Sequence, residues 1–192
     1  MKKLFSILLI AFTLVINVKA EEIPSFVAPT SENTFSINLS YWKSEMVDVR
    51  IKDEFGNILV SEKLSTKDNK ARAYNLKNLV DGNYTVEVED KTRLVKQDVS
   101  LTDNLVTSST TVKNIYKPNT KFVDGIFKIN YLTLGHDVTV KIVSATGDVV
   151  FSQSYENQAA INKAYDLNNL NRGSYNAIVV SNDDVYSFDL VK

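Results

Sequence analysis

The sequence predicts an all-β protein: two tandem immunoglobulin-like (fibronectin III-like) β-sandwich domains behind an N-terminal signal peptide. Three observations support this fold class. The first twenty residues form an apolar leader with a positively charged start, and the rest of the chain repeats itself at a constant offset. Within each copy, apolar residues alternate with polar ones at the period of two that is typical of half-buried strands. Outside the leader, no window has sustained helical periodicity.

The leader has the layout of a secretory signal peptide. Lys2 and Lys3 precede an apolar stretch from Leu4 to Val18, and Ala20 completes a cleavage site. The stretch is shorter than the roughly 20 apolar residues that a membrane span needs. We therefore expect residues 1–20 to be removed and the protein to be exported without a transmembrane anchor, to the periplasm, the cell surface or the extracellular space. Since the chain has no cysteine, each exported domain must be stable through apolar burial alone.

The repeat has an offset of 91 residues and divides the chain into two domains. The same residue occurs at both members of many pairs, among them Val47 and Val138, Gly56 and Gly147, Leu76 and Leu167, Gly82 and Gly173, Tyr84 and Tyr175, and Asp98 and Asp189. Self-similarity at a fixed spacing is the signature of a duplicated structural unit. We predict one sandwich over residues 21–103 and a second over 104–192.

Each copy contains a series of short strands separated by turns. In the first copy the alternating stretches are 35–41, 47–52, 58–60, 84–89 and 92–101, with a hairpin turn at 55–57. In the second copy the last alternating stretch is 186–190. We expect residues 23–27 to open the first copy. By analogy, the second half of the joining segment 102–124 is expected to form the first strand of the second copy, with a turn at Pro118-Asn119.

The approach to one strand in each copy predicts a tyrosine corner. Two leucines and a glycine lead into Tyr84 in the first copy, and the same spacing leads into Tyr175 in the second. In this device a tyrosine near the start of a strand donates its hydroxyl proton to the backbone just upstream. We therefore interpret Tyr84 and Tyr175 as structural residues.

These motifs resemble a known domain family. The pattern V-x-V-x-I followed by Y-x-L-x-x-L-x-x-G-x-Y, with Gly147, Leu170, Gly173 and Tyr175 at matching positions and Leu190-Val191-Lys192 after them, is similar to the C-terminal sorting domain of Bacteroidota type IX secretion substrates and to related immunoglobulin-like repeats of small secreted proteins. The resemblance implies an Ig-like sandwich whose last strands act as an export signal recognised at the outer membrane. Two features depart from the family pattern: the unit occurs twice without a separate cargo domain, and Tyr116-Lys117-Pro118-Asn119 only faintly matches the usual Tyr-Pro-Asn-Pro opening.

Composition argues against several classes of function. Without Lys2, Lys3 and Lys19, 19 of the 22 basic residues remain against 23 acidic ones, so nucleic-acid binding is not expected. His136 is the single histidine and sits in a predicted turn. No phosphate-binding loop, cysteine site or calcium loop is present, and we expect no catalytic residue, no metal site and no cofactor.

Two features are candidates for partner contact. If Tyr41 faces the core, Trp42 faces outward, where its ring could stack on a sugar or anchor a partner; the alternative is a tryptophan folded over the core rim. Second, Val143, Ile178 and Val180 occupy positions where the first copy has charged residues. We expect them to form an apolar surface that packs against the first copy, the joining segment or an outside partner.

The leading functional prediction is a non-enzymatic secreted or cell-envelope protein with a structural or interaction role. The alternatives are a type IX secretion substrate whose second repeat is the sorting domain, and a glycan-binding module that uses Trp42. The expected partner is a protein or the secretion machinery, with a glycan as the other possibility.

Overall fold

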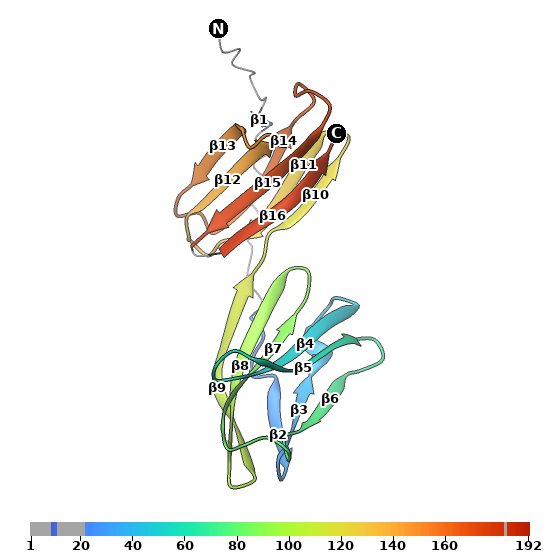
Figure 1. Cartoon of the computed structure of the whole chain (residues 1–192), viewed down its shortest axis with the longest axis vertical. Helices are drawn as coiled ribbons and strands as arrows, with labels where there is room; N and C mark the ends of the chain where they lie inside the picture. Colours follow the sequence, from blue (N-terminus) through green and yellow to red (C-terminus); the bar gives the residue numbers. More distant parts are fainter. Residues whose placement is uncertain (1–8, 11–21, 183) are drawn as a thin grey trace. The chain divides into compact units, whose positions relative to one another are not determined.

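The computed structural model describes residues 9–10, 22–182 and 184–192, so most of the predicted signal peptide lies outside the described residues and stays a prediction (Figure 1). The chain divides into two compact units, residues 22–115 and residues 116–192, with residues 9–10 joined to the second. Each unit is built from two β-sheets and has its own hydrophobic core. The all-β prediction of two tandem immunoglobulin-like sandwiches is confirmed.

The first unit packs a three-stranded sheet against a five-stranded one. The small sheet has the order β2 (Val27–Ser31), β3 (Thr34–Asn38) and β6 (Ala71–Asn75). The large sheet has the order β5 (Ile58–Ser65), β4 (Met46–Asp53), β7 (Gly82–Glu89), β8 (Arg93–Thr102) and β9 (Leu105–Tyr116). Strands β4, β5, β7 and β8 pair antiparallel.

The second unit repeats this arrangement. One sheet has the order β1 (Leu9–Ile10), β14 (Ala160–Asp166), β11 (Ile126–Leu132) and β10 (Asn119–Val123). The other has the order β13 (Val149–Tyr155), β12 (Val138–Ser144), β15 (Ser174–Ser181) and β16 (Asp184–Val191). Strands β10 to β16 therefore take the places of β2 to β8, and β1 and β9 are the two strands without a counterpart.

The alternation seen in the sequence places one face of each strand in a core. Val49 and Ile51 of β4 and Val86 and Val88 of β7 are fully buried, with Val140 and Ile142 as their relatives on β12. Burying such a side chain contributes about 1.5–3 kcal/mol. The residues of the first core all lie between Ile23 and Val112, and those of the second between Tyr116 and Leu190. Two separate interiors account for stability without a disulfide.

Strand β9 corrects the expected domain boundary. Residues 104–116 were expected to begin the second copy, but β9 is hydrogen-bonded beside β8 in the first unit. Val106 is buried in the first core, Val112 packs against it, and the Asn114 side chain exchanges hydrogen bonds of 3.2 and 3.4 Å with the backbone of Ile23. The division between the two compact units therefore lies between residues 115 and 116 and not after residue 103, because β9 pairs with β8, and the repeat could not reveal a strand that the second copy lacks. The first strand of the second copy is β10.

Trp42 also departs from expectation. The indole is only 4% exposed and packs edge-on against Phe26, at 5.3 Å between ring centroids, whereas Tyr41 is 38% exposed. The reason is a 3₁₀ turn, η1 (Leu39–Tyr41), that follows β3 and is capped by the side chain of Asn38. Three residues per turn replace the strand period of two, which exchanges the two orientations. The outward placement of Trp42 is wrong, and its ring is not available for stacking on a sugar.

Candidate functional site

The predicted tyrosine corners lie at equivalent places in the two units. The Tyr84 hydroxyl donates to the carbonyl of Val80 at 2.5 Å, and the Tyr175 hydroxyl donates to the carbonyl of Asn171 at 3.0 Å. Both acceptors lie four residues upstream, in the loop that leads into β7 or β15. Tyr84 is buried, whereas Tyr175 is half-buried. The hydroxyls therefore fix the loops at the start of these strands and are not free to act on a ligand.

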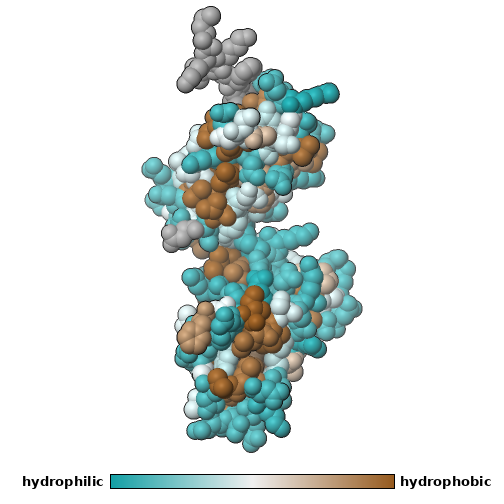
Figure 2. All heavy atoms as spheres, viewed as in Figure 1, coloured by the Kyte–Doolittle hydropathy of each residue, from teal (hydrophilic) through white to brown (hydrophobic). Residues whose placement is uncertain are grey.

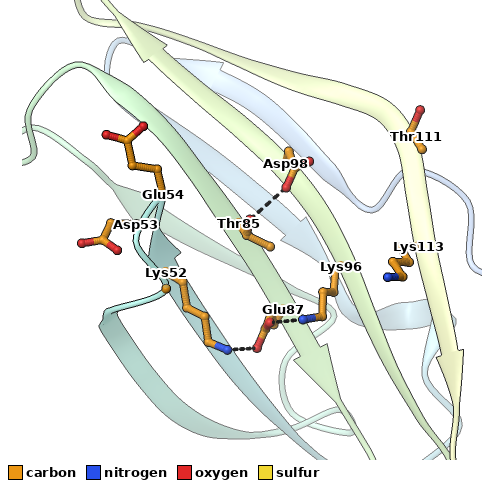
Figure 3. Close-up of a pocket in the computed structure, with 10 residues that line it drawn as sticks. Lys52, Asp53, Glu54, Thr85, Glu87, Lys96, Asp98, Thr111 and Lys113 are labelled. Atoms are coloured by element: carbon orange, nitrogen blue, oxygen red, sulfur yellow. Dashed lines mark hydrogen bonds and ion pairs between the residues drawn. The ribbon is translucent and has the colours of Figure 1, made fainter. Parts of the chain in front are cut away.

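The outer face of the large sheet in the first unit carries a charge cluster centred on Glu87. Its carboxylate is 2% exposed and accepts from Lys52 at 2.9 Å, from Lys96 at 2.7 Å and from Arg50 at 3.3 Å (Figure 3). Arg50 also pairs with Glu89 on the same strand as Glu87. The cations come from β4 and β8 and flank β7 on both sides, which the strand registers require because Arg50 and Lys96 each lie directly opposite Glu87.

The pairing sets the protonation state of Glu87. Burial alone would raise the pKa of this carboxyl, but the hydrogen bonds and charges of Lys96 and Lys52 outweigh burial and hold the pKa below its ordinary value. Glu87 is therefore an anion at neutral pH. The cluster pairs three cations, Arg50, Lys52 and Lys96, with the two anions Glu87 and Glu89, and all five residues belong to the same sheet.

Beside this cluster lies an open depression with a volume of about 480 Å³. Lys52, Glu87 and Lys96 line it, and Figure 3 shows the two lysines paired with Glu87 and the Thr85 hydroxyl donating to Asp98, at 2.9 Å. Acidic and basic groups are mixed along its lining, which includes Asp53, Glu54 and Lys113. The arrangement is that of a solvated, self-paired charged surface.

The same outer face in the second unit is more apolar, although Lys141 remains there, directly opposite Ile178. Three of the cluster positions are replaced, with Val143 for Lys52, Ile178 for Glu87 and Val180 for Glu89. All three alternate with buried residues of β12 and β15, so they lie on the outer side of the sheet, where they are half-buried. The structure thus places Val143, Ile178 and Val180 on one surface and outside the core; whether a partner contacts them stays a prediction.

Two further residues extend this surface. Val149 lies opposite Val143 and is 58% exposed, and Val185 lies opposite Val180 and is 66% exposed. Ile178 is the diagonal neighbour of Val143 across the two strands. We call the five residues Val143, Val149, Ile178, Val180 and Val185 the valine face. Figure 2 shows apolar residues gathered on the side of the second unit that carries β12, β15 and β16.

Sequence reasoning did not include Val149 and Val185 in this surface. Val149 sits at a register shift between β12 and β13, so its face could not be assigned from alternation. Val185 could have been found, because it alternates with the inward residues Tyr186, Phe188 and Leu190.

The described part of the chain offers little for catalysis. Among residues 9–10, 22–182 and 184–192, no group of three His, Cys, Asp or Glu side chains lies close enough to hold a metal ion. His136 lies in a turn, where its backbone N–H donates to the carbonyl of Thr133 at 3.0 Å. No helix in the described ranges has the length and apolar character to cross a bilayer.

Known structures resemble this chain only weakly. Two solved structures align with most of this chain at low similarity. The FN1–FN3 domains of chicken CNTN1 align at 11% identity over 88% of this chain and 65% of their own length, with a TM-score of 0.29. The BSP domain of a biofilm associated protein aligns at 10% identity over 87% of this chain and 30% of its own length, with a TM-score of 0.27. None of the curated proteins compared with this chain matches its sequence.

One family matches the chain twice, once in each sandwich. It is described as a secretion system C-terminal sorting domain, and the matched residues are 28–101 and 118–192. The first range runs from β2 to β8 and the second from β10 to β16, so the repeat found in the sequence, the repeat found in the fold and the two matches coincide. Since the matches cover well over half of the residues, this chain belongs to the secretion system C-terminal sorting domain family.

Proposed function

We propose that this chain is a non-enzymatic secreted or cell-surface protein whose second repeat is the sorting element read by the secretion machinery. The family match supports a role in secretion, and it covers both repeats equally. The observation that distinguishes the repeats is the valine face. It is the one feature of the outer sheet surfaces that gives the second repeat a contact area where the first has a self-paired charge cluster.

The chemistry of the valine face suits a protein partner. Contiguous exposed apolar side chains mark contact surfaces, because covering them removes apolar area from water at about 25 cal/mol per Å². The side chains lie on paired strands, which hold their spacing fixed in advance of binding. This chain would therefore lose little conformational freedom when a partner with a complementary apolar surface binds.

The proposal is tested by replacing the centre of the valine face in the bacterium that makes the protein. Val143→Thr, Ile178→Thr and Val180→Thr together keep β-branched side chains and remove apolar contact. We expect the fraction of protein outside the cell, measured by immunoblot of medium and surface fractions, to fall at least fivefold. A matched control carries Leu105→Thr and Val123→Thr, which are exposed apolar residues elsewhere. Unchanged export of the triple variant would refute the proposal.

A second candidate is an interaction module in which neither repeat is a sorting signal. It is favoured by the match of residues 28–101, which makes the first copy another unit of the same family and leaves no separate cargo domain among the described residues. Mass spectrometry of the protein from its native cell separates the two. Loss of residues 118–192 from the mature surface form supports sorting, and a mature form that keeps them supports the module.

A further inference from the structure

The outer edge of β14 in the second unit carries an additional strand. Residues 9–10 form β1, which pairs antiparallel with β14 in a defined register, Leu9 opposite Tyr165 and Ile10 opposite Ala164. The counterpart of β14 in the first unit is β6, which is an edge strand of its sheet. The β14 edge is therefore paired with a further strand, whereas β6 is the last strand of its sheet, although the two sandwiches are copies.

Side chains close the β6 edge of the first unit. Glu62 on β5 accepts from Nε and Nη2 of Arg72 on β6, at 3.0 Å for each contact, and also from the hydroxyl of Tyr74. The guanidinium of Arg72 lies 5.9 Å from the centre of the Tyr74 ring. This bidentate bridge joins the two sheets along one side of the sandwich. A charged side chain fixed beside an edge strand hinders the approach of another strand.

The equivalent side of the second unit has no such bridge. At the offset of 91 residues, Glu62, Arg72 and Tyr74 correspond to Gln153, Lys163 and Tyr165. The hydroxyl of Tyr155 lies 2.6 Å from that of Tyr165 and donates to Gln153 at 3.0 Å, while Lys163 lies over the Tyr155 ring at 5.6 Å. Within residues 118–182 and 184–192, the structure contains no ion pair. Neutral hydrogen bonds and ring contacts replace the ionic bridge.

We propose that the β14 edge is a strand-acceptor site, filled by the chain's own leader around Leu9–Ile10 while the leader is attached and opened when it is removed. The leader suits this position because residues 4–18 contain no charged side chain, so pairing desolvates no ion. An added strand satisfies backbone donors and acceptors that an open edge exposes. The inference goes beyond the proposed sorting role and does not depend on the valine face.

The absence of cysteine from the chain makes the pairing measurable by cross-linking. The full chain is made by cell-free synthesis, so that the leader is retained, with Ile10→Cys and Ala164→Cys. Directly opposed residues on neighbouring strands lie within disulfide range. The control carries Ile10→Cys and Ala73→Cys, because Ala73 is the residue of β6 that corresponds to Ala164. We expect the disulfide between positions 10 and 164 to exceed that between 10 and 73 at least tenfold under the same mild oxidation.

Two additional measurements extend the test, and the first of them needs no cysteine variant. Ile10→Pro in the full chain removes a backbone donor from β1, and hydrogen exchange of the β14 amides should then accelerate at least fivefold, with the β6 amides unchanged. In a trans assay, a synthetic peptide of residues 2–13 with cysteine at position 10 should cross-link to Ala164→Cys more strongly when the attached leader carries Ile10→Pro. Equal cross-linking of positions 73 and 164, or β14 exchange unaffected by Ile10→Pro, overturns the proposal.

Discussion

The two sandwiches share a core plan and differ in what they present to solvent. Phe35 and Phe127, and Tyr84 and Tyr175, occupy matching places inside the two units, whereas Glu87 and Ile178 occupy matching places on the outer sheet face. On this face the first unit carries the ion-paired cluster around Glu87, whereas the second carries Val143, Ile178 and Val180. The comparison teaches that the two copies keep a common interior, which any sandwich of this kind needs, while the outer face differs in charge between them.

The largest expected effect comes from breaking one core without the other. Phe35→Ala should destabilise the first unit by about 3–5 kcal/mol, because a fully buried aromatic ring leaves a cavity. Phe127→Ala should do the same to the second unit. Trp42 is the single tryptophan and lies in the first core, so its fluorescence in a urea titration reports the first unit alone, whereas far-UV circular dichroism reports both. An equal shift of the tryptophan transition by Phe127→Ala would contradict two separate interiors.

A smaller effect is expected from copying one surface residue of the second unit into the first. Glu87→Ile leaves Arg50, Lys52 and Lys96 crowded without their shared anion, and should destabilise the first unit by about 1–3 kcal/mol. Adding Lys52→Val, Glu89→Val and Lys96→Ser completes the change and should recover most of this loss, since the effects of residues in one network are not additive. Tryptophan fluorescence during urea unfolding measures both. A quadruple variant less stable than Glu87→Ile would show that the cluster is not a unit.

Lowering the pH should destabilise the first unit more than the second, because the charge cluster around Glu87 lies in the first unit. The folded-state pKa of Glu87 lies below its ordinary value of 4.5, so the stability it contributes is fully present above pH 4.5 and is lost as the pH falls through the folded pKa. We expect the midpoint of the Trp42 transition to fall as the pH drops below 4.5, with a shallower fall in Glu87→Gln. Identical pH profiles for the parent and Glu87→Gln would show that Glu87 carries no charge-dependent stability.

The smallest expected effect concerns the tyrosine corners. Tyr84→Phe and Tyr175→Phe each remove one hydrogen bond to a backbone carbonyl, which is worth about 0.5–1.5 kcal/mol. The loss should be larger for Tyr84, because its hydrogen bond is part-buried, whereas the hydrogen bond of Tyr175 is exposed to water. Unfolding followed by circular dichroism and fluorescence gives both values. A larger loss for Tyr175→Phe would reverse this reasoning.

The fold could be predicted from the sequence because each strand is marked by its own alternation of apolar and polar residues and because the repeat shows that alternation twice. Alternation assigned Val49, Ile51 and their relatives in the second copy to the cores, and the repeat supplied each assignment a second time. Prediction failed where a local irregularity changes the period. The 3₁₀ turn at Leu39–Tyr41 reversed Trp42, and the extra strand β9 shifted the boundary, since pairing between β8 and β9 leaves no mark in the alternation of either strand.

The surface was only partly predictable for a related reason. Comparing the copies located Val143, Ile178 and Val180, because substitutions of charge by apolar residues stand out at a fixed offset. The Glu62–Arg72 bridge and its replacement by tyrosines could not be foreseen, because it joins two sheets whose spacing the sequence does not specify.

The most direct test of the difference between the repeats is to transfer the charge cluster onto the second unit. Val143→Lys, Ile178→Glu, Val180→Glu and Ser187→Lys give β12, β15 and β16 the residues of the first unit, while Lys141 already stands at the place of Arg50. The matched control is the reverse transfer on the first unit described above. Export of folded protein from the native cell is measured for both. We predict a loss of at least fivefold for the variant of the second unit and none for the control; equal export of the two variants and the parent would contradict the account.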